Sequence, residues 1–379
     1  MKIVHITPFY RPSIGGVEEI VYNTVKELAK RGHEVHVVSV NYDNRWKEIA
    51  KPSTVVEEGV IVHRLRPSFI KIGYATLMHD LKKVLFEIKP DIVHSHNLHP
   101  HLFQAIAWKS KVGYKVVAQL HFPKMTGVDN LIAKMFFEPT MKILTWNQNN
   151  VDVFIVHTQL EKQWFINSGI NGDKISIIKY PCAPDSLAAY VPKRDIHELL
   201  GSDIVITYVS RIHRRKGQHL LIKASEHLRN YLNRNFKVYI AGPISDQKYF
   251  IELHNLIQRL NLSGIVVLEP RILREEEKLD YMSTSNIFAL TSLMDYTPVA
   301  VFESLALGTP VVATNVGALG EYAPDVQGLY LASHDPKDIA QKIVDALNKG
   351  RQVNAEAFRC NNIVTKVEEL YTRILKPTL

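Results

Sequence analysis

Two carboxylates, Asp295 and Glu303, stand eight positions apart in a segment with the pattern of a strand end, a loop, a helix and a buried strand. Pro298 suits the first helical position and Thr297 can cap the helix, so the backbone amides around Val299 should face the opening above the sheet. A helix start of this kind binds anions. The two acids could then accept hydrogen bonds from sugar and ribose hydroxyls beside a diphosphate. An isolated pair of acids would be an ordinary surface feature. The surrounding sequence pattern is what favours a ligand-binding role for this pair.

A second segment, residues 206–217, ends a strand and opens a helix with dense positive charge. Arg211 can bind phosphate oxygens through its forked guanidinium, and Lys216 can place a point charge beside them. Together they could stabilise a diphosphate leaving group. A nucleic-acid patch and an ordinary solvated helix start are the alternatives, but a position in a strand-to-helix crevice favours phosphate.

The sequence lacks the usual device that binds a nucleotide diphosphate through a metal ion, because it contains no Asp-x-Asp pair. Arg211 and Lys216 would have to supply the positive charge that a divalent cation supplies elsewhere. We therefore expect a metal-independent reaction, with no metal site and no cofactor.

Glycines and histidines in the first half fall where strands are expected to end. Gly15 and Gly16 follow the first strand and open a helix, so the backbone could approach a phosphate closely. A plain loop-to-helix turn explains these two residues equally well, since they do not form the dinucleotide fingerprint. His94, His96 and His121 follow strands at the edge where open α/β sheets bind ligands. His94 fits a buried histidine best.

Short apolar strands alternate with helical patterns through both halves, which predicts an α/β fold with two doubly wound parallel sheets. The expected strands are Lys2–Thr7, Glu34–Ser39, Ile61–Arg64, Ile92–Ser95, Lys115–Leu120, Val153–His157, Ile175–Ile178, Ile204–Val209, Lys237–Ala241, Ile265–Leu268, Ile287–Leu290 and Pro310–Thr314. The expected helices are Val17–Arg31, Leu77–Ile88, Gln218–Arg229, Lys248–Leu260, Val299–Leu307 and Pro336–Asn348.

Neither a strand pattern nor a helical pattern is present between Tyr180 and Pro192, and this stretch contains three prolines. It therefore predicts a hinge between domains. We expect one Rossmann-like domain at residues 1–185, a second at residues 186–360 and a terminal helix at residues 361–379. A chain of 379 residues is also long for a single hydrophobic core.

The amino terminus lacks the pattern of a secretion signal, and no apolar run approaches the ~18 residues of a membrane helix. The two cysteines, Cys182 and Cys360, are far apart and lack metal-ligand spacing. We expect neither a disulfide nor a zinc site, and a reducing cytoplasm as the setting.

The net charge of +8 is divided unevenly, since residues 1–185 carry 23 basic and 17 acidic residues. A basic half can attract phosphates, anionic lipid headgroups or nucleic acid, although a solvated surface explains so small an excess at least as well. Basic residues gathered on one face would indicate nucleic acid, and this distribution does not show them. We expect no nucleic-acid partner.

The segment with Asp295 and Glu303 continues into Gly308-Thr-Pro310-Val-Val, and this pattern resembles the donor-binding motif of glycosyltransferase family 4. In that family the first acid contacts the transferred sugar and the second holds the ribose. The first acid is usually Glu, so Asp295 is a departure that bears on the choice of donor.

Three further motifs carry the same resemblance. Ser210-Arg211 to Lys216-Gly217 is similar to the Gly-Arg-x-x-x-x-Lys-Gly element, with Ser210 where glycine is commoner. Gly15-Gly16 resembles the amino-terminal loop that faces the donor diphosphate. His121 matches the histidine near the donor sugar. The hinge Pro181-Cys-Ala-Pro-Asp185 and the loop Gly317-Ala-Leu-Gly320-Glu321 depart from the family pattern.

The resemblance implies the GT-B fold, with an acceptor domain and a donor domain facing each other across a cleft. It also implies that the terminal helix at residues 361–379 crosses back to the first domain. It implies a retaining transfer of a hexose-type sugar from a nucleotide-diphosphate donor to a glycan, lipid-linked or small-molecule acceptor. The implied catalytic residues are Asp295, His121, Arg211 and Lys216. The implied substrate-binding residues are Gly15, Gly16, Arg211, Lys216, Asp295, Thr297, Pro298, Val299 and Glu303.

Two other functions remain open at this point. A nucleotide-sugar 2-epimerase uses a related fold and needs no acceptor, and a non-catalytic protein could bind nucleotide sugars. The acid pair together with Arg211 and Lys216 favours a transferase. The basic first half suits an acceptor at the inner membrane surface, for instance a polyprenyl-phosphate-linked glycan, with peripheral membrane contact.

Overall fold

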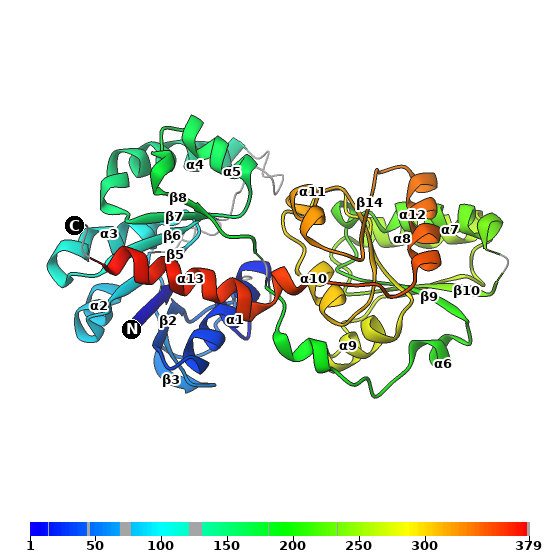
Figure 1. Ribbon diagram of the computed structural model, residues 1–379, viewed down its shortest axis with the longest axis horizontal. Helices are drawn as coiled ribbons and strands as arrows, with labels where there is room; N and C mark the ends of the chain where they lie inside the picture. Colours follow the sequence, from blue (N-terminus) through cyan, green and yellow to red (C-terminus); the bar gives the residue numbers. More distant parts are fainter. Residues whose placement is uncertain are drawn as a thin grey trace. The chain divides into compact units, whose positions relative to one another are not determined.

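The computed structural model describes residues 1–13, 15–43, 46–68, 77–120, 131–180, 182–232 and 234–376, without the side chains of residues 131–137. The chain divides into two compact units (Figure 1). The first unit comprises Met1–Cys182 together with Cys360–Leu379, and the second comprises Ala183–Arg359. The boundary expected at residues 185 and 186 therefore lies three residues beyond the point where the chain leaves the first unit.

The first unit is built on a sheet of eight described strands in the order β3-β4-β2-β1-β5-β6-β7-β8. Its strands are β1 (Lys2–Ile6), β2 (Glu34–Val40), β3 (Ser53–Glu57), β4 (Val60–Leu65), β5 (Ile92–His96), β6 (Lys115–Gln119), β7 (Val153–Val156) and β8 (Ile175–Ile177). Its helices are α1 (Gly16–Lys30), α2 (Leu81–Ile88), α3 (Pro100–Val112), α4 (Leu131–Asn147), α5 (Gln159–Asn167) and α13 (Cys360–Leu375). The strands pair in parallel except β3, which runs antiparallel to β4 at the edge.

One face of this first sheet is covered by α1 and α13, which contact each other (Figure 1). Ile3 of β1 and Ile92 of β5 are fully buried there in one cluster with Val21 of α1 and Val364 of α13. Side chains two positions apart in a strand share a face, so His5, His94 and His96 also lie under these helices. The terminal helix is therefore part of the first core.

The second unit is built on a sheet of six described strands in the order β11-β10-β9-β12-β13-β14, all parallel. Its strands are β9 (Ile204–Val209), β10 (Phe236–Ala241), β11 (Val266–Glu269), β12 (Ile287–Leu290), β13 (Val311–Thr314) and β14 (Leu329–Ala332). Its helices are α6 (Ile196–Leu200), α7 (Gln218–Tyr231), α8 (Gln247–Arg259), α9 (Glu275–Thr284), α10 (Val299–Ala306), α11 (Leu319–Tyr322) and α12 (Pro336–Lys349).

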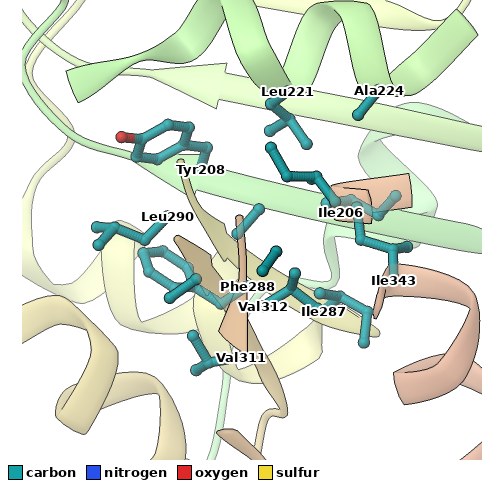
Figure 2. Packing of buried hydrophobic residues seen from close by; sticks show 14 of the residues in the cluster. Ile206, Tyr208, Leu221, Ala224, Ile287, Phe288, Leu290, Val311, Val312 and Ile343 are labelled. Atoms are coloured by element: carbon teal, nitrogen blue, oxygen red, sulfur yellow. The ribbon is translucent and has the colours of Figure 1, made fainter. Parts of the chain in front are cut away.

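Alternate residues of the second sheet pack against helices on its two faces. Ile206 of β9 lies with Leu221 of α7 and Ile343 of α12 in the main core, as Figure 2 shows. Val205, one position earlier, belongs to a smaller cluster with Tyr281 of α9. Strands buried on both faces explain why these segments are continuously apolar in the sequence.

Each sheet has one point where its strand order reverses. On one side of this point successive strands are added toward one edge of the sheet, and on the other side they are added toward the opposite edge. The reversal lies between β1 and β5 in the first sheet and between β9 and β12 in the second. Open α/β sheets bind ligands beyond the carboxyl ends of the strands at such points. The loops that follow β9 and β12 are therefore the places to look for chemistry in the second unit.

Cys182 and Cys360 form a disulfide, with their Cα atoms 4.6 Å apart. The expectation of no disulfide was wrong, because α13 returns to the first unit and places Cys360 beside the end of that unit's first segment. A sequence separation of 178 residues gives no hint of this proximity.

Several elements differ from the sequence predictions. The helix expected from Leu77 begins at Leu81, since Met78 pairs with Pro67 in an isolated bridge. Strand β3 was not predicted because its side chains are mostly exposed, Val56 by 72%, so it lacks the apolar alternation of a core strand. Among the described residues, no helix is both long and apolar enough to cross a bilayer.

Candidate active site

The loops after β9 and β12 are joined by an ion pair between Lys216 Nζ and Asp295 Oδ2. Lys216 ends a short 3-10 turn, η5 (Arg214–Lys216), that follows β9, and Asp295 lies five residues beyond the end of β12. Both side chains are about one-fifth exposed, at 22% and 19%. The structure therefore brings together two of the predicted site residues at the reversal of strand order.

The backbone holds these two loops together. The carbonyl of Arg215 accepts a hydrogen bond from the amide of Leu293 at 2.8 Å, and Thr291 Oγ1 donates to the carbonyl of Gly217 at 2.9 Å. Gly217 has a φ of +63°, and a Cβ added there would lie 2.0 Å from the carbonyl oxygen of Thr291. Only glycine allows this approach, which explains the Lys-Gly sequence at the end of the turn.

Asp295 is positioned by its own loop as well as by Lys216. The amide of Tyr296 donates to Asp295 Oδ1 at 3.1 Å. Gly317 packs against the backbone of the same loop, because a Cβ there would lie 2.4 Å from the carbonyl oxygen of Asp295. One oxygen of the carboxylate therefore faces the backbone and the other faces Lys216.

Helix α10 begins with Val299, one residue later than a helix capped by Thr297 would begin. Pro298 is the residue preceding its first turn, with extended backbone, and no side chain caps the helix. The prediction that Thr297 caps this helix was therefore wrong, because Pro298 takes the capping position. Thr297 and Val299 are half-buried and Pro298 is buried.

Glu303, in the second turn of α10, is held by a lysine that the motifs in the sequence do not include. Lys278 Nζ of α9 lies 3.2 Å from each carboxylate oxygen of Glu303 and 2.9 Å from Glu275 Oε1. Burial acts to lower the pKa of Lys278, but the carboxylates of Glu303 and Glu275 outweigh it and raise that pKa. The ammonium ion fixes the orientation of the Glu303 carboxylate.

Arg211 follows β9 by two residues and is exposed. Its carbonyl accepts a hydrogen bond from Gln218 Nε2 at 2.8 Å, and its guanidinium forms no ion pair with the described residues. The neighbouring carbonyl of Ser210 packs against Gly242, where a Cβ would come within 1.9 Å of that oxygen. Arg211 thus has a fixed backbone and a cation that can bind phosphate oxygens.

In the first unit, Gly15 and Gly16 precede and open α1, as predicted. A Cβ on Gly15 would lie 2.3 Å from Glu18 Oε2, whereas Gly16 has open space around it. The carboxylate of Glu18 folds back over Gly15, and its burial raises the pKa of Glu18 to about 7. Glu18 belongs to the glycine motif, but a glutamate in the first turn of a helix is ordinarily solvated, so its burial was not predicted.

The histidines on the first sheet form a buried cluster. His5 Nδ1 lies 2.9 Å from His96 Nε2, and His94 Nδ1 lies 2.6 Å from the hydroxyl of Tyr371 on α13. Burial lowers the pKa of His5 to about 3. One ring nitrogen from each of His5, His94 and His96 lies within 4.8 Å of the others, so these imidazoles could serve as metal ligands. Three neutral ligands in a dry interior would leave the charge of a dication uncompensated, which disfavours that use.

His121, the remaining predicted catalytic residue, lies outside the described residues. The predicted residues therefore fall into two groups. Lys216 and Asp295 are in direct contact, and Arg211 and Glu303 belong to the same unit on the loops and helix around them. Gly15 and Gly16 belong to the other unit.

Two protein-family models match the chain. Residues 14–182 match the model described as Glycosyltransferase Family 4, and residues 192–361 match the model described as Glycosyl transferases group 1. The first match ends at the boundary of the first unit, and the second contains Arg211, Lys216, Asp295 and Glu303.

The chain is also similar to known proteins over nearly its whole length. One subunit of the phosphatidylinositol N-acetylglucosaminyltransferase of Arabidopsis thaliana is 27% identical over 398 residues, which cover 99% of this chain and 83% of that protein. The D-inositol 3-phosphate glycosyltransferase of Paenarthrobacter aurescens is 23% identical over 372 residues, with 90% and 87% covered.

Among solved structures, Anabaena HepE in complex with UDP superimposes with a TM-score of 0.73 at 22% identity, covering 98% of this chain and 100% of that one. This similarity establishes the fold. The two family models and the relatives show that the chain belongs to glycosyltransferase family 4 and is a nucleotide-sugar-dependent glycosyltransferase, here with the GT-B fold.

Proposed function

We propose that this glycosyltransferase is a retaining, metal-independent enzyme that moves a hexose-type sugar from a UDP-sugar to an inositol-bearing acceptor. The observation that carries the proposal is the Lys216–Asp295 pair, which fixes a cation and a carboxylate side by side at the reversal of strand order. A glycosyl donor offers a diphosphate to the cation and sugar hydroxyls to the carboxylate.

The proposed roles follow from the chemistry of each side chain. The ammonium of Lys216 has three hydrogens, so it can bind Asp295 and still donate to a diphosphate oxygen. Arg211 adds a forked cation for the same phosphates, and their joint charge stabilises the leaving group as the bond to the sugar breaks. Glu303, held by Lys278, accepts hydrogen bonds from the ribose hydroxyls.

In the proposed reaction the bond between the anomeric carbon and the diphosphate oxygen breaks. A bond between that carbon and the acceptor oxygen forms on the same face, and the acceptor proton passes to the leaving diphosphate. Asp295 orients the sugar hydroxyls, and His121 is proposed to lie at the reacting face. This route needs no dedicated general base.

The choice of donor and acceptor is supported by the relatives. HepE was solved with UDP, and two relatives are named for transfer to phosphatidylinositol and to D-inositol 3-phosphate. The aspartate at position 295 is one methylene shorter than the usual glutamate, a difference that bears on which hexose is transferred. N-acetylglucosamine is the first sugar to test, because the Arabidopsis enzyme is named for its transfer.

The test of the donor site is a thermal-shift series with UDP, GDP and ADP, each with and without EDTA, because a ligand that binds the folded state raises its melting temperature. We expect UDP, and neither GDP nor ADP, to raise the melting temperature. EDTA should leave this shift unchanged, and Arg211→Ala should abolish it. Lys248→Ala, on an exposed part of α8, is the matched control. Stabilisation that EDTA removes would contradict metal independence, and no response to any nucleotide would contradict the donor site.

The test of the transferase reaction is incubation with UDP-N-acetylglucosamine with and without phosphatidylinositol. Product that appears only with the acceptor and keeps the α configuration supports the proposal. Release of free UDP and a 2-epimeric sugar without acceptor would instead indicate the epimerase.

We also propose that the acceptor is met at a membrane surface. Support comes from the basic excess of the first unit's sequence and from two exposed apolar side chains on α4, Trp146 at 80% and Ile143 at 43%, which lie one turn apart. Cosedimentation with vesicles that contain anionic lipid should fall at high salt and in Trp146→Ala. Equal binding to neutral vesicles at all salt concentrations would contradict this surface.

A further inference from the structure

The second unit contains a pocket of about 420 Å³ between α7 and α8, apart from the Lys216–Asp295 pair. Its lining includes Arg214, His219, Lys223, Tyr249, Glu252 and Arg259. The volume suits a small molecule, since ligand pockets typically span roughly 300–1,000 Å³.

The charge of this pocket is strongly one-sided. Arg214, Lys223 and Arg259 are cations, and Glu252 is the one acid of its lining and is already paired with Arg214. Lys223 and Arg259 form no ion pair with the described residues. A concave wall with several cations and one neutralised acid concentrates positive potential, which favours an anionic ligand.

His219 adds a directed hydrogen-bond donor to the cations. The hydroxyl of the buried Tyr249 accepts from the backbone amide of His219 at 3.0 Å, so its own hydrogen can point to His219 Nδ1, 2.8 Å away. Burial, followed by the charges of Lys223 and Arg214, lowers the pKa of His219. A neutral imidazole that accepts at Nδ1 carries its hydrogen on Nε2, where it can donate to a ligand.

The pocket and the donor site share the η5 turn. Arg214 opens this turn and contacts Tyr249 and Glu252 on the α8 side, while Lys216 closes it and pairs with Asp295. Between them, the carbonyl of Arg215 accepts from the amides of Leu293 and Met294 in the Asp295 loop, at 2.8 and 3.3 Å. An anion that draws Arg214 away from Glu252 therefore pulls on a turn that positions Lys216.

We propose that this pocket is a second, phosphate-binding site, and that a phosphorylated small molecule bound there changes the affinity of the donor site through the η5 turn. The second half of this statement rests on the proposed donor site. The first half stands without it, because none of the pocket residues belongs to that site. By linkage, the donor must change the affinity of the pocket for its ligand by the same factor.

The test uses calorimetric titration of the full chain with inorganic phosphate and with glucose 6-phosphate, at constant ionic strength. The pocket variant is Lys223→Ala/Arg259→Ala, and the matched control is Arg229→Ala/Lys248→Ala, which removes one cation from each of the same two helices outside the pocket. We expect the wild type and the control to bind alike, and the pocket variant to bind about tenfold or more weakly, since hydrogen bonds to charged groups are lost.

Four results separate this proposal from the donor-site proposal. Equal binding by the pocket variant and the control would overturn the second site, and so would phosphate binding that is lost in Arg211→Ala but kept in the pocket variant. The Kd of UDP should change when glucose 6-phosphate is present in the wild type and not in the pocket variant. An unchanged Kd for UDP in the wild type would overturn the coupling, and failure of UDP to bind at all would count against the donor site instead.

Discussion

At the scale of single residues, Glu18 is a carboxyl group whose ionisation the fold resists. Its carboxylate is folded over Gly15 at the start of α1, and burial raises its pKa from 4.5 to about 7. A raised folded-state pKa means that the protonated form is favoured in the native state. The stability that Glu18 contributes is therefore fully present below pH 4.5 and is lost as the pH rises through about 7.

We expect Glu18→Gln to remove this pH dependence, because a neutral amide resembles the protonated acid. The free energy of unfolding of the variant should match the wild type near pH 4.5 and exceed it by about 3 kcal/mol at pH 8 to 9. Urea unfolding at five pH values measures the difference. A difference that stays constant across this range would show that Glu18 titrates normally.

Lys278 offers a second prediction at this scale. Loss of its ammonium leaves the Glu303 carboxylate, which is only 14% exposed, without the cation that orients it. We expect Lys278→Ala to raise the Kd for UDP about tenfold, since a hydrogen bond to a charged group contributes roughly 1.5–3 kcal/mol. Titration calorimetry with UDP measures the change.

Glu275→Gln is the control for Lys278→Ala, because it removes the other carboxylate partner of Lys278 and leaves the contact with Glu303. Glu275 is 72% exposed, so its pairing should contribute little. An equal loss of UDP affinity in both variants would mean that α9 is disturbed as a whole. Unchanged affinity in Lys278→Ala would remove Glu303 from the ribose site.

The site residues differ in how far the sequence could predict them. Arg211, Lys216 and Asp295 lie in the loops that follow strands β9 and β12, so their placement at one sheet edge is set by topology. Lys278 follows three glutamates at the start of a helix, a pattern that is typical of a solvated helix start, and only the tertiary structure shows that its ammonium contacts Glu303 of α10. The prediction that Thr297 caps α10 was wrong because Pro298 itself occupies the capping position.

At the scale of elements, α13 is attached to the first unit by side-chain packing and by the Cys182–Cys360 disulfide. The bond closes a loop of 178 residues in sequence separation, so it restricts the unfolded chain strongly. On the loop-entropy model this restriction is worth about 5 kcal/mol. We expect reduction to lower the melting temperature of the wild type by about 10 °C, as measured by calorimetry with and without dithiothreitol.

Cys182→Ala supplies the control for the effect of the reductant. This variant should melt near the temperature of the reduced wild type and should not respond to dithiothreitol. A wild type that also fails to respond, with two free thiols by alkylation and mass spectrometry, would show that the bond does not form in solution.

Elements buried on both faces were the most predictable. Strands β9 and β12 have the predicted bounds, Ile204–Val209 and Ile287–Leu290, because continuous apolar runs between turn residues define them. Strand β3 and helix α9 were not predicted, because an exposed edge strand and a highly charged helix have no continuous apolar run in the sequence. The resemblance to the family predicts that the terminal helix returns to the first domain, but the pairing of Cys360 with Cys182 could not be predicted, since it depends on where α13 begins in the tertiary fold.

At the scale of the whole molecule, alternation of strands and helices is enough to predict two doubly wound sheets, but not which segments belong to which sheet. The first unit is discontinuous in sequence, since it needs Cys360–Leu379 as well as Met1–Cys182. The second unit is continuous and holds Arg211, Lys216, Lys278, Asp295 and Glu303. The two units therefore differ in what they need in order to fold alone.

The fragment of residues 183–359 should fold by itself, because its sheet is complete and its core is its own. Since it holds those five residues of the proposed donor site, it should bind UDP with a Kd within about tenfold of the full chain, and Arg211→Ala in the fragment should abolish binding. The fragment of residues 1–182 should aggregate, because removal of α13 exposes the apolar surface that Ile363, Val364 and Val367 cover in the intact chain. Circular dichroism and gel filtration of both fragments test the contrast. A folded fragment 183–359 that does not bind UDP would mean that the first unit supplies essential donor contacts, with Gly15 and Gly16 the first residues to substitute.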